Sequence, residues 1–377
     1  MGRFIPLSVP NLSGNEKKYA LDAIEQTWVS TGGAYITEFE HKLADFMHVE
    51  QVAACQSGTS ALHLALIECG VQSGDAVIVP TLTFIAAVNP VLYQSAEPIF
   101  MDCDDSLCMD PAKLKEFCEK ECAYENHILT YRGKKVKAVV VVHVFGNLAD
   151  MEAIKTIAEQ YGIKVVEDAT EALGTYYTSG RYSGKYAGTI GDYGAFSFNG
   201  NKIITTGGGG AVTAGNTAYV SHMRYLSTQA KTDPHYYIHD EVGFNYRMTN
   251  LQAALGVAQM EQIEKLREIV NGSSNIVFFG GAGVSTESGI PDFRSVDGLY
   301  HQTYDYPPET ILSHTFYRQK PEEFFRFYRN KMLCPDAKPN AAHLKLAQWE
   351  KEGKLKAVIT QNIDGLHQAA GSREVLE

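Results

Sequence analysis

The 377-residue sequence lacks three features that would each define a protein class. Its seven cysteines include no C-x-x-C pair, which argues against a zinc knuckle, and their odd number argues against a disulfide framework. No apolar run approaches the roughly 20 residues that a membrane-spanning helix needs. With 33 basic against 44 acidic side chains, the chain lacks the basic excess of a general nucleic-acid binder. We therefore expect a cytoplasmic protein with no nucleic-acid, membrane or metal partner.

The composition is that of an ordinary globular protein, with 45% apolar and 20% charged residues. The length suggests about two domains. Charge is distributed unevenly: residues 265–377 carry 14 basic and 14 acidic side chains, so the whole net charge of −11 lies before them. This step in charge predicts two units of different origin, residues 1–262 and residues 263–377.

Strand and helix patterns alternate through most of the first unit. Short apolar or β-branched runs predict strands over residues 76–80, 98–102, 137–143 and 164–168. Helical patterns cover residues 13–27 and 59–69, residues 151–161 form an amphipathic helix pattern, and a longer helix is predicted over residues 249–270. This rhythm predicts an α/β fold with a mostly parallel sheet, in which ligands bind at the carboxyl ends of the strands.

Two motifs of the first unit could hold an anionic cofactor and its ring. Ser57-Gly58-Thr59 opens a helix, where free N–H groups and the helix dipole attract a phosphate, although a simple N-cap would have the same sequence. Asp168 ends a buried strand, so its carboxylate should point into the crevice. A carboxylate facing a pyridinium nitrogen keeps that nitrogen protonated, while the alternative is an acid that caps the next turn.

Lys202 is the candidate nucleophile of the first unit. It lies between a strand-like stretch and the glycine run 207–210, where backbone can approach a ligand closely. A desolvated lysine can lose its proton and condense with an aldehyde, whereas a lone lysine near glycines is usually a surface residue. Ser197 could offer its hydroxyl to the phosphate, and Phe84 could stack on a cofactor face or simply belong to the core.

With these motifs, residues 4–262 resemble the DegT family of sugar-nucleotide aminotransferases, which are pyridoxal phosphate enzymes of fold type I. The resemblance implies the large domain of that fold. Segments 8–15, 197–206 and 243–250 most resemble the branch that aminates UDP-4-keto-6-deoxy-N-acetylhexosamines for surface polysaccharide biosynthesis. Some relatives carry histidine at the position of Lys202 and dehydrate sugars, so the lysine of this chain favours transamination.

The resemblance also implies a role for each candidate residue. Lys202 would bond to pyridoxal phosphate and move the proton, with L-glutamate as donor and a UDP-keto-sugar as acceptor. The other implied cofactor contacts are Asp168 at the pyridinium nitrogen, Gly58, Thr59 and Ser197 at the phosphate, Phe84 on the ring, Glu171 near the cofactor hydroxyl, and Asn245 reaching the other subunit's phosphate in a homodimer. The family's C-terminal small domain does not follow here, and we expect its absence to impair turnover.

The second unit contains a different glycine turn, Gly280-Gly-Ala-Gly283, after a predicted strand over residues 275–279. Such a turn can hold a pyrophosphate. The run 280–294 and the segment 360–371 resemble the sirtuins, NAD-dependent protein deacylases, and imply a partial Rossmann-like domain. By this resemblance NAD would contact Ala282, Gly283, Asp292, Phe293 and Arg294, and its ribose and nicotinamide would lie against Gln361, Asn362, Ile363 and Asp364.

We expect this NAD site of the second unit to be vestigial. The sirtuin catalytic His-Gly pair and zinc cysteines have no counterpart in residues 265–377, which contain only Cys334, and His367 belongs to the second signature. The leading interpretation is therefore a truncated sugar aminotransferase joined, through one helix near residues 263–266, to a truncated and inactive sirtuin. The alternatives are an NAD-dependent deacylase and a non-catalytic fusion that binds cofactor.

Overall fold

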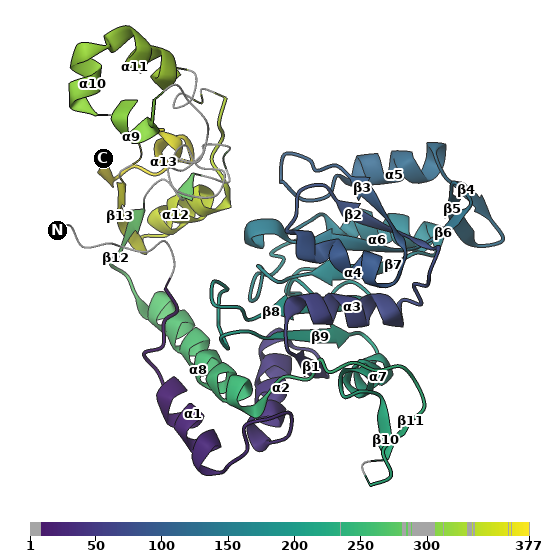
Figure 1. Cartoon of the computed structure of the whole chain (residues 1–377). Helices are drawn as coiled ribbons and strands as arrows, with labels where there is room; N and C mark the ends of the chain where they lie inside the picture. Colours follow the sequence, from purple (N-terminus) through teal and green to yellow (C-terminus); the bar gives the residue numbers. More distant parts are fainter. Residues whose placement is uncertain are drawn as a thin grey trace. The chain divides into compact units, whose positions relative to one another are not determined.

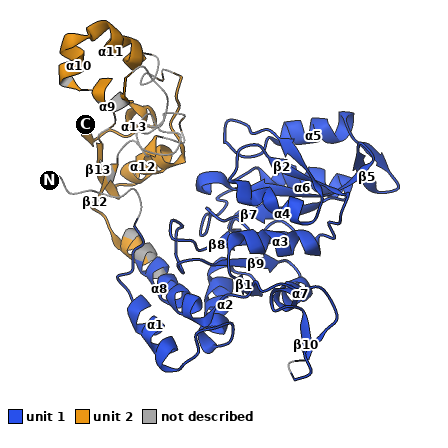
Figure 2. Ribbon diagram, in the orientation of Figure 1, with its two compact units in different colours: residues 1–265 blue, residues 266–377 orange. Residues whose placement is uncertain are grey.

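The computed structural model divides into two compact units, residues 1–265 and 266–377 (Figure 2). It describes residues 9–233, 235–280, 284–285, 288, 306–311, 313–329, 334, 336–360, 362 and 364–376. Helix α8 (Asn250–Gly272) is continuous across the boundary between the units. Among the described residues, no helix is long and apolar enough to cross a bilayer.

One sheet forms the centre of the first unit (Figure 1). In spatial order its main strands are β1 (Val52–Cys55), β9 (Gly210–Ala214), β8 (Tyr193–Ser197), β7 (Lys164–Asp168), β6 (Lys134–Val142), β2 (Ala76–Pro80) and β3 (Glu97–Met101). The neighbours from β8 to β3 pair in parallel, and β9 is antiparallel to both of its neighbours. The predicted α/β fold with a mostly parallel sheet is confirmed.

Apolar side chains on both faces bury this sheet. All five residues of β2 are buried, and the run Val139–Val142 of β6 is buried as well, as expected for a strand covered on both faces. Along β8 the side chains alternate between two core clusters, with Ala195 in one and Phe196 in the other. Helices must therefore cover both faces, as Figure 1 shows.

Polar N-caps start four of the helices of the first unit. Ser57, Asp110, Asp150 and Asn216 each accept a hydrogen bond from an N–H of the first turn of the helix that follows. The helices of this unit are α1 (Glu16–Glu25), α2 (Ala34–Met47), α3 (Gly58–Glu68), α4 (Asn89–Tyr93), α5 (Pro111–Lys120), α6 (Met151–Tyr161), α7 (Thr217–Ser227) and most of α8, with short 3-10 turns η1 (Ile85–Ala87) and η2 (Val144–Gly146). Two hairpins complete it, β4 (Ala123–Glu125) with β5 (Ile128–Tyr131), and β10 (Lys231–Asp233) with β11 (Ile238–His239).

The second unit contains a small parallel sheet in the order β12 (Ile276–Gly280), β13 (Leu355–Thr360) and β14 (Val375–Leu376). Its described helices are α9 (Pro308–Ile311), α10 (His314–Gln319), α11 (Pro321–Phe327), α12 (Ala341–Lys351) and α13 (Leu366–Ala369). Leu346 of α12 packs against Leu355 and Val358 of β13 in an apolar cluster. The strand predicted over residues 275–279 is present as β12.

Candidate functional site

Asp168 is the last residue of β7, at the carboxyl end of the sheet. Its side chain is buried, and Thr170 N donates a 3.0 Å hydrogen bond to its Oδ1. Burial raises the pKa of Asp168 above its ordinary value, while the hydrogen bonds from Thr170 and the positive charge of Lys202 act in the opposite direction. The nearby positive charge of Lys202 therefore does not fully offset the cost of burying the Asp168 carboxylate.

The amine of Lys202 lies near this carboxyl group, in the connection between β8 and β9. Its Nζ donates to Glu171 Oε1 at 3.1 Å, and the Lys202 side chain is only 16% exposed. The other oxygen of Glu171 accepts a 2.9 Å hydrogen bond from Phe145 N. Glu171 thus holds the ammonium group beside the end of β7. The family resemblance implied that Glu171 lies near the cofactor hydroxyl, but nothing in the sequence indicated its ion pair with Lys202.

The start of α3 is the turn that the sequence predicts to bind an anion. Ser57 caps the helix by accepting from Ser60 N, and the N–H groups of Gly58 and Thr59 have no partner among the described residues. Gly58 packs closely: a Cβ there would lie 2.9 Å from Ser197 Cβ and 3.0 Å from Thr170 Cγ2. The turn therefore adjoins both Ser197 and the segment that follows Asp168.

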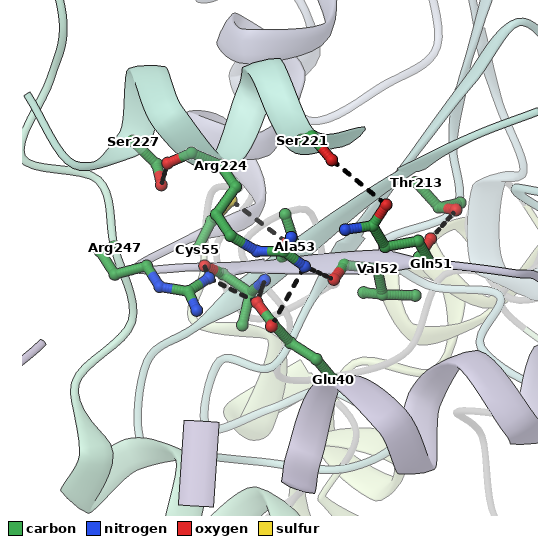
Figure 3. A network of polar contacts seen from close by, with 11 residues as sticks. Glu40, Gln51, Val52, Ala53, Cys55, Thr213, Ser221, Arg224, Ser227 and Arg247 are labelled. Carbon is green, nitrogen blue, oxygen red and sulfur yellow. Dashed lines mark hydrogen bonds and ion pairs between the residues drawn. The ribbon is translucent and has the colours of Figure 1, made fainter. Parts of the chain in front are cut away.

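A buried ionic network fixes the strand that leads into this turn (Figure 3). Strand β1 lies at the edge of the sheet, where an isolated antiparallel bridge between Cys55 and Arg247 pairs only the end of its outer side. Glu40 Oε1 accepts from Ala54 N at 2.7 Å, Arg247 Nη1 donates to Ala54 O at 3.2 Å, and Arg224 Nη2 donates to Val52 O at 2.8 Å. Glu40 also forms ion pairs with both arginines. These charged side chains bond the outer backbone groups of Val52 and Ala54, which precede that bridge.

Two candidate cofactor contacts lie outside the cluster of Asp168, Lys202 and the α3 turn. Phe84 is the residue before η1, and its side chain is 78% exposed. Asn245 is exposed and pairs with Thr228 through a β-bridge. Neither residue has a contact with the rest of the site that the structure records, so their roles toward a cofactor remain predictions.

The candidate NAD residues are only partly covered by the structure. Those outside the described residues are Ala282, Gly283, Asp292, Phe293, Arg294, Gln361 and Ile363. The two that are described, Asn362 and Asp364, meet at one hydroxyl group. Asn362 Nδ2 donates to Ser285 Oγ at 2.9 Å, and that hydroxyl donates to Asp364 Oδ2 at 2.6 Å. These contacts join the two segments in which the sequence motifs lie.

Two buried histidines, His343 and His367, lie next to the Ser285 hydroxyl and its two partners. The rings of His343 and His367 lie 4.5 Å apart between centroids. Burial lowers the pKa of His343 to about 4 and also lowers the pKa of His367. Both rings are therefore neutral at pH 7, and His367 is 1% exposed.

Comparison with known families identifies the first unit. The family model of the DegT/DnrJ/EryC1/StrS aminotransferases matches residues 10–270. The chain belongs to this family. It is 42% identical over 262 residues to the GDP-perosamine synthase of Caulobacter vibrioides, covering 69% of this chain and 66% of that protein. It is 41% identical over 273 residues to the GDP-perosamine synthase of Escherichia coli O157:H7, covering 71% and 70%.

Solved structures give the same fold. The aminotransferase from Psychrobacter cryohalolentis superimposes with a TM-score of 0.61 at 29% identity, covering 72% of this chain and 67% of that one. An aminotransferase of the same family from Brucella abortus gives a TM-score of 0.59 at 29% identity, covering 68% and 67%. The chain spans about two thirds of the length of the aminotransferases that it matches.

The second unit matches another family. The Sir2 family model covers residues 281–377. The chain is 62% identical over 120 residues to an NAD-dependent protein deacetylase of Clostridium acetobutylicum, which covers 31% of this chain and 49% of that protein. The two-part organisation inferred from the motifs is confirmed, and the second part spans about half the length of the deacetylase.

Aminotransferases of this family use pyridoxal phosphate, and the residues of the first unit fit that group. The N–H groups of Gly58 and Thr59, which no described residue accepts from, suit a phosphate. A buried carboxyl group with a raised pKa suits a cationic ring nitrogen, and the Lys202 amine lies near it. Thr170, which the sequence reading did not single out, connects these parts because it bonds Asp168 and packs against Gly58. The only feature of the sequence that could have indicated a role for Thr170 is its position between Asp168 and Glu171.

Substituting Gly58→Ala should weaken binding of pyridoxal phosphate at least about tenfold, since the added Cβ must displace Ser197 or Thr170 and distort the anion turn. A spectrophotometric titration of the full chain measures the dissociation constant. Gly215→Ala is the matched control, because a Cβ there meets no atom within 4 Å. Unchanged affinity in Gly58→Ala would show that the start of α3 does not hold the phosphate.

Proposed function

We propose that the first unit is a pyridoxal phosphate-dependent aminotransferase that transfers the amino group of L-glutamate to a nucleotide-linked 4-keto-6-deoxy sugar, in the synthesis of a surface glycan precursor. The observation that carries the proposal is the Lys202 amine, which lies 3.1 Å from Glu171 and close enough to buried Asp168 to lower its pKa against the effect of burial. Family membership supports the same reaction class.

When bound, pyridoxal phosphate supplies an electron-accepting ring that lets a proton leave the carbon next to an amine. The N–H groups of Gly58 and Thr59, with the hydroxyl of Ser197, would hold the phosphate. Asp168 would face the ring nitrogen and keep a proton there. Because burial makes an unpartnered carboxylate unfavourable, a cationic ring beside Asp168 would lower the pKa of that carboxyl group and gain binding free energy.

Lys202 would perform the proton transfers. Glu171 accepts a hydrogen bond from the Lys202 ammonium group in the resting site. Nζ would first give up one proton, to Glu171 or to solvent, and the neutral amine could then take a proton from the amino-acid carbon and return one to the sugar carbon. Lys202 would thus serve twice, first as the attachment point of the cofactor and then as the acid–base group. In a homodimer, the exposed Asn245 would contact the phosphate held by the other subunit.

The chain should acquire a visible absorbance band after addition of pyridoxal phosphate, and Lys202→Ala should abolish that band because no other amine lies beside Asp168 among the described residues. Lys185→Ala is the matched control, since Lys185 is an exposed lysine elsewhere in the same unit. The proposal fails if Lys202→Ala keeps the band or if Lys185→Ala loses it.

The nucleotide of the sugar is the finer part of the proposal. The motifs in segments 8–15, 197–206 and 243–250 favour a UDP-linked sugar. The relatives named GDP-perosamine synthase favour a GDP-linked one. We propose UDP and predict that L-glutamate is consumed with a UDP-4-keto-6-deoxy sugar, measured as release of 2-oxoglutarate. Turnover with the GDP-linked counterpart alone would assign the site to GDP-sugars.

The second unit is a separate proposal: it keeps part of an NAD site and does not deacylate. A general base must reach the substrate, and the two histidines next to Ser285, His343 and His367, are buried. We predict that the full chain, given NAD and an acetylated peptide, releases no deacetylated product above a reaction without NAD. The Clostridium acetobutylicum deacetylase provides the positive control. NAD-dependent product would restore the deacylase alternative.

A further inference from the structure

Helix α8 holds the loop that carries Lys202. We call residues 199–209, between β8 and β9, the lysine loop. Gln252 and Gln259 lie seven residues apart on α8, so they project from one face of the helix. Each donates to, or accepts from, a backbone group of the lysine loop. The two glutamines thus hydrogen-bond the backbone of the lysine loop at two points, Thr205 and Gly208, both after Lys202.

Gln259 makes the more buried of the two contacts. Its Oε1 accepts a 3.2 Å hydrogen bond from Thr205 N. Its Nε2 donates to Asn11 O and to Glu16 Oε1, both at 2.7 Å. The Gln259 side chain is 4% exposed, and Thr205 and Glu16 are buried as well. Both amide protons and the amide oxygen of Gln259 are therefore used, and none can be replaced by water without rearranging the site.

Gln252 contacts the same loop three residues further along, at Gly208. Its Nε2 donates to Gly208 O at 2.7 Å, while its Oε1 accepts from Thr249 at the start of α8. The part of the loop that precedes Gly208 is closed on itself, because Thr206 N donates to Phe198 O at 2.9 Å. Lys202 lies midway in the closed segment, between Phe198 and Thr206.

We propose that Gln252 and Gln259 are positioning residues that fix the lysine loop, so that the Lys202 amine stands ready to bond the cofactor. The inference rests on the proposed function, because it assumes that Lys202 bonds pyridoxal phosphate. An amine on a loop free to move would sample many positions, and the bond would form at the cost of ordering that loop. The contacts from α8 remove this cost before the cofactor arrives.

The structure separates this role from a direct contact with the cofactor. Neither glutamine bonds to Asp168, Glu171 or the start of α3 in the contacts that the structure records. Their recorded contacts with the lysine loop are therefore the route by which they can act on Lys202, while Gln259 also bonds Asn11 and Glu16 and Gln252 also bonds Thr249. Loss of a glutamine should therefore weaken the bond at Lys202 and leave the phosphate and ring contacts intact.

Two ligands separate these effects in the full chain. Pyridoxal phosphate can bond to Lys202, while pyridoxamine 5′-phosphate has the same phosphate and ring but no aldehyde. The variants are Gln259→Leu and Gln252→Leu. The matched control is Glu261→Ala, because Glu261 also lies on α8 but contacts Asn15 and Tyr19 rather than the lysine loop. Hydrogen exchange of residues 199–209 is measured in the cofactor-free chains.

We expect each glutamine variant to raise the dissociation constant of pyridoxal phosphate about tenfold and that of pyridoxamine 5′-phosphate less than about twofold, with exchange of the lysine loop about tenfold faster. Glu261→Ala should change neither constant. If Gln259→Leu does not fold, Gln252→Leu alone carries the comparison, since Gln252 is less buried.

The proposal is overturned if both ligands weaken equally, if the control behaves like the glutamine variants, or if loop exchange is unchanged. Failure of the proposed function itself would look different: the unsubstituted chain would bind pyridoxal phosphate and pyridoxamine 5′-phosphate equally and would show no visible band. Lys202 would then form no bond, whatever the exchange rates of the lysine loop, and the positioning role would fall with it.

Discussion

The candidate site depends on one constraint: an amine, a buried carboxyl group and N–H groups with no partner in the described part of the chain must meet where parallel strands end. Strand β7 delivers Asp168 to that edge, and β8 delivers Ser197. The connection to β9 then returns Lys202 to within 3.1 Å of Glu171. Since ligands collect at the carboxyl ends of parallel strands, the sheet order determines which side chains can act together.

The two buried carboxyl groups Glu40 and Asp168 of the first unit have different roles. Glu40 is matched by two arginines and by backbone groups of the edge strand β1, so it stabilises the approach to the anion turn. Asp168 is only partly compensated, and burial raises its pKa. A buried carboxyl group without enough positive charge around it favours a cationic ligand. In the same fold, the fully paired Glu40 holds backbone in place, while Asp168 is left to interact with a ligand.

Much of this arrangement could be predicted from local sequence. The apolar runs 76–80 and 164–168 and the amphipathic stretch 151–161 became β2, β7 and α6, because clear stops bound each of them. The strands β1 and β9 were not predicted, since their alanine, glycine and cysteine residues have little preference for strands. Nor could a local pattern reveal that Gln259 bonds Thr205, 54 residues away, or that Glu171 holds Lys202. The charge step at residue 265, by contrast, coincides with the boundary between the two units.

The central claim is that the nitrogen of Lys202 bonds the cofactor. Borohydride reduction of the full chain loaded with pyridoxal phosphate, followed by digestion and mass spectrometry, locates the bonded lysine directly. The account predicts one pyridoxyl group on the peptide that contains Lys202. A label on another lysine, or one spread over several surface lysines, would contradict it.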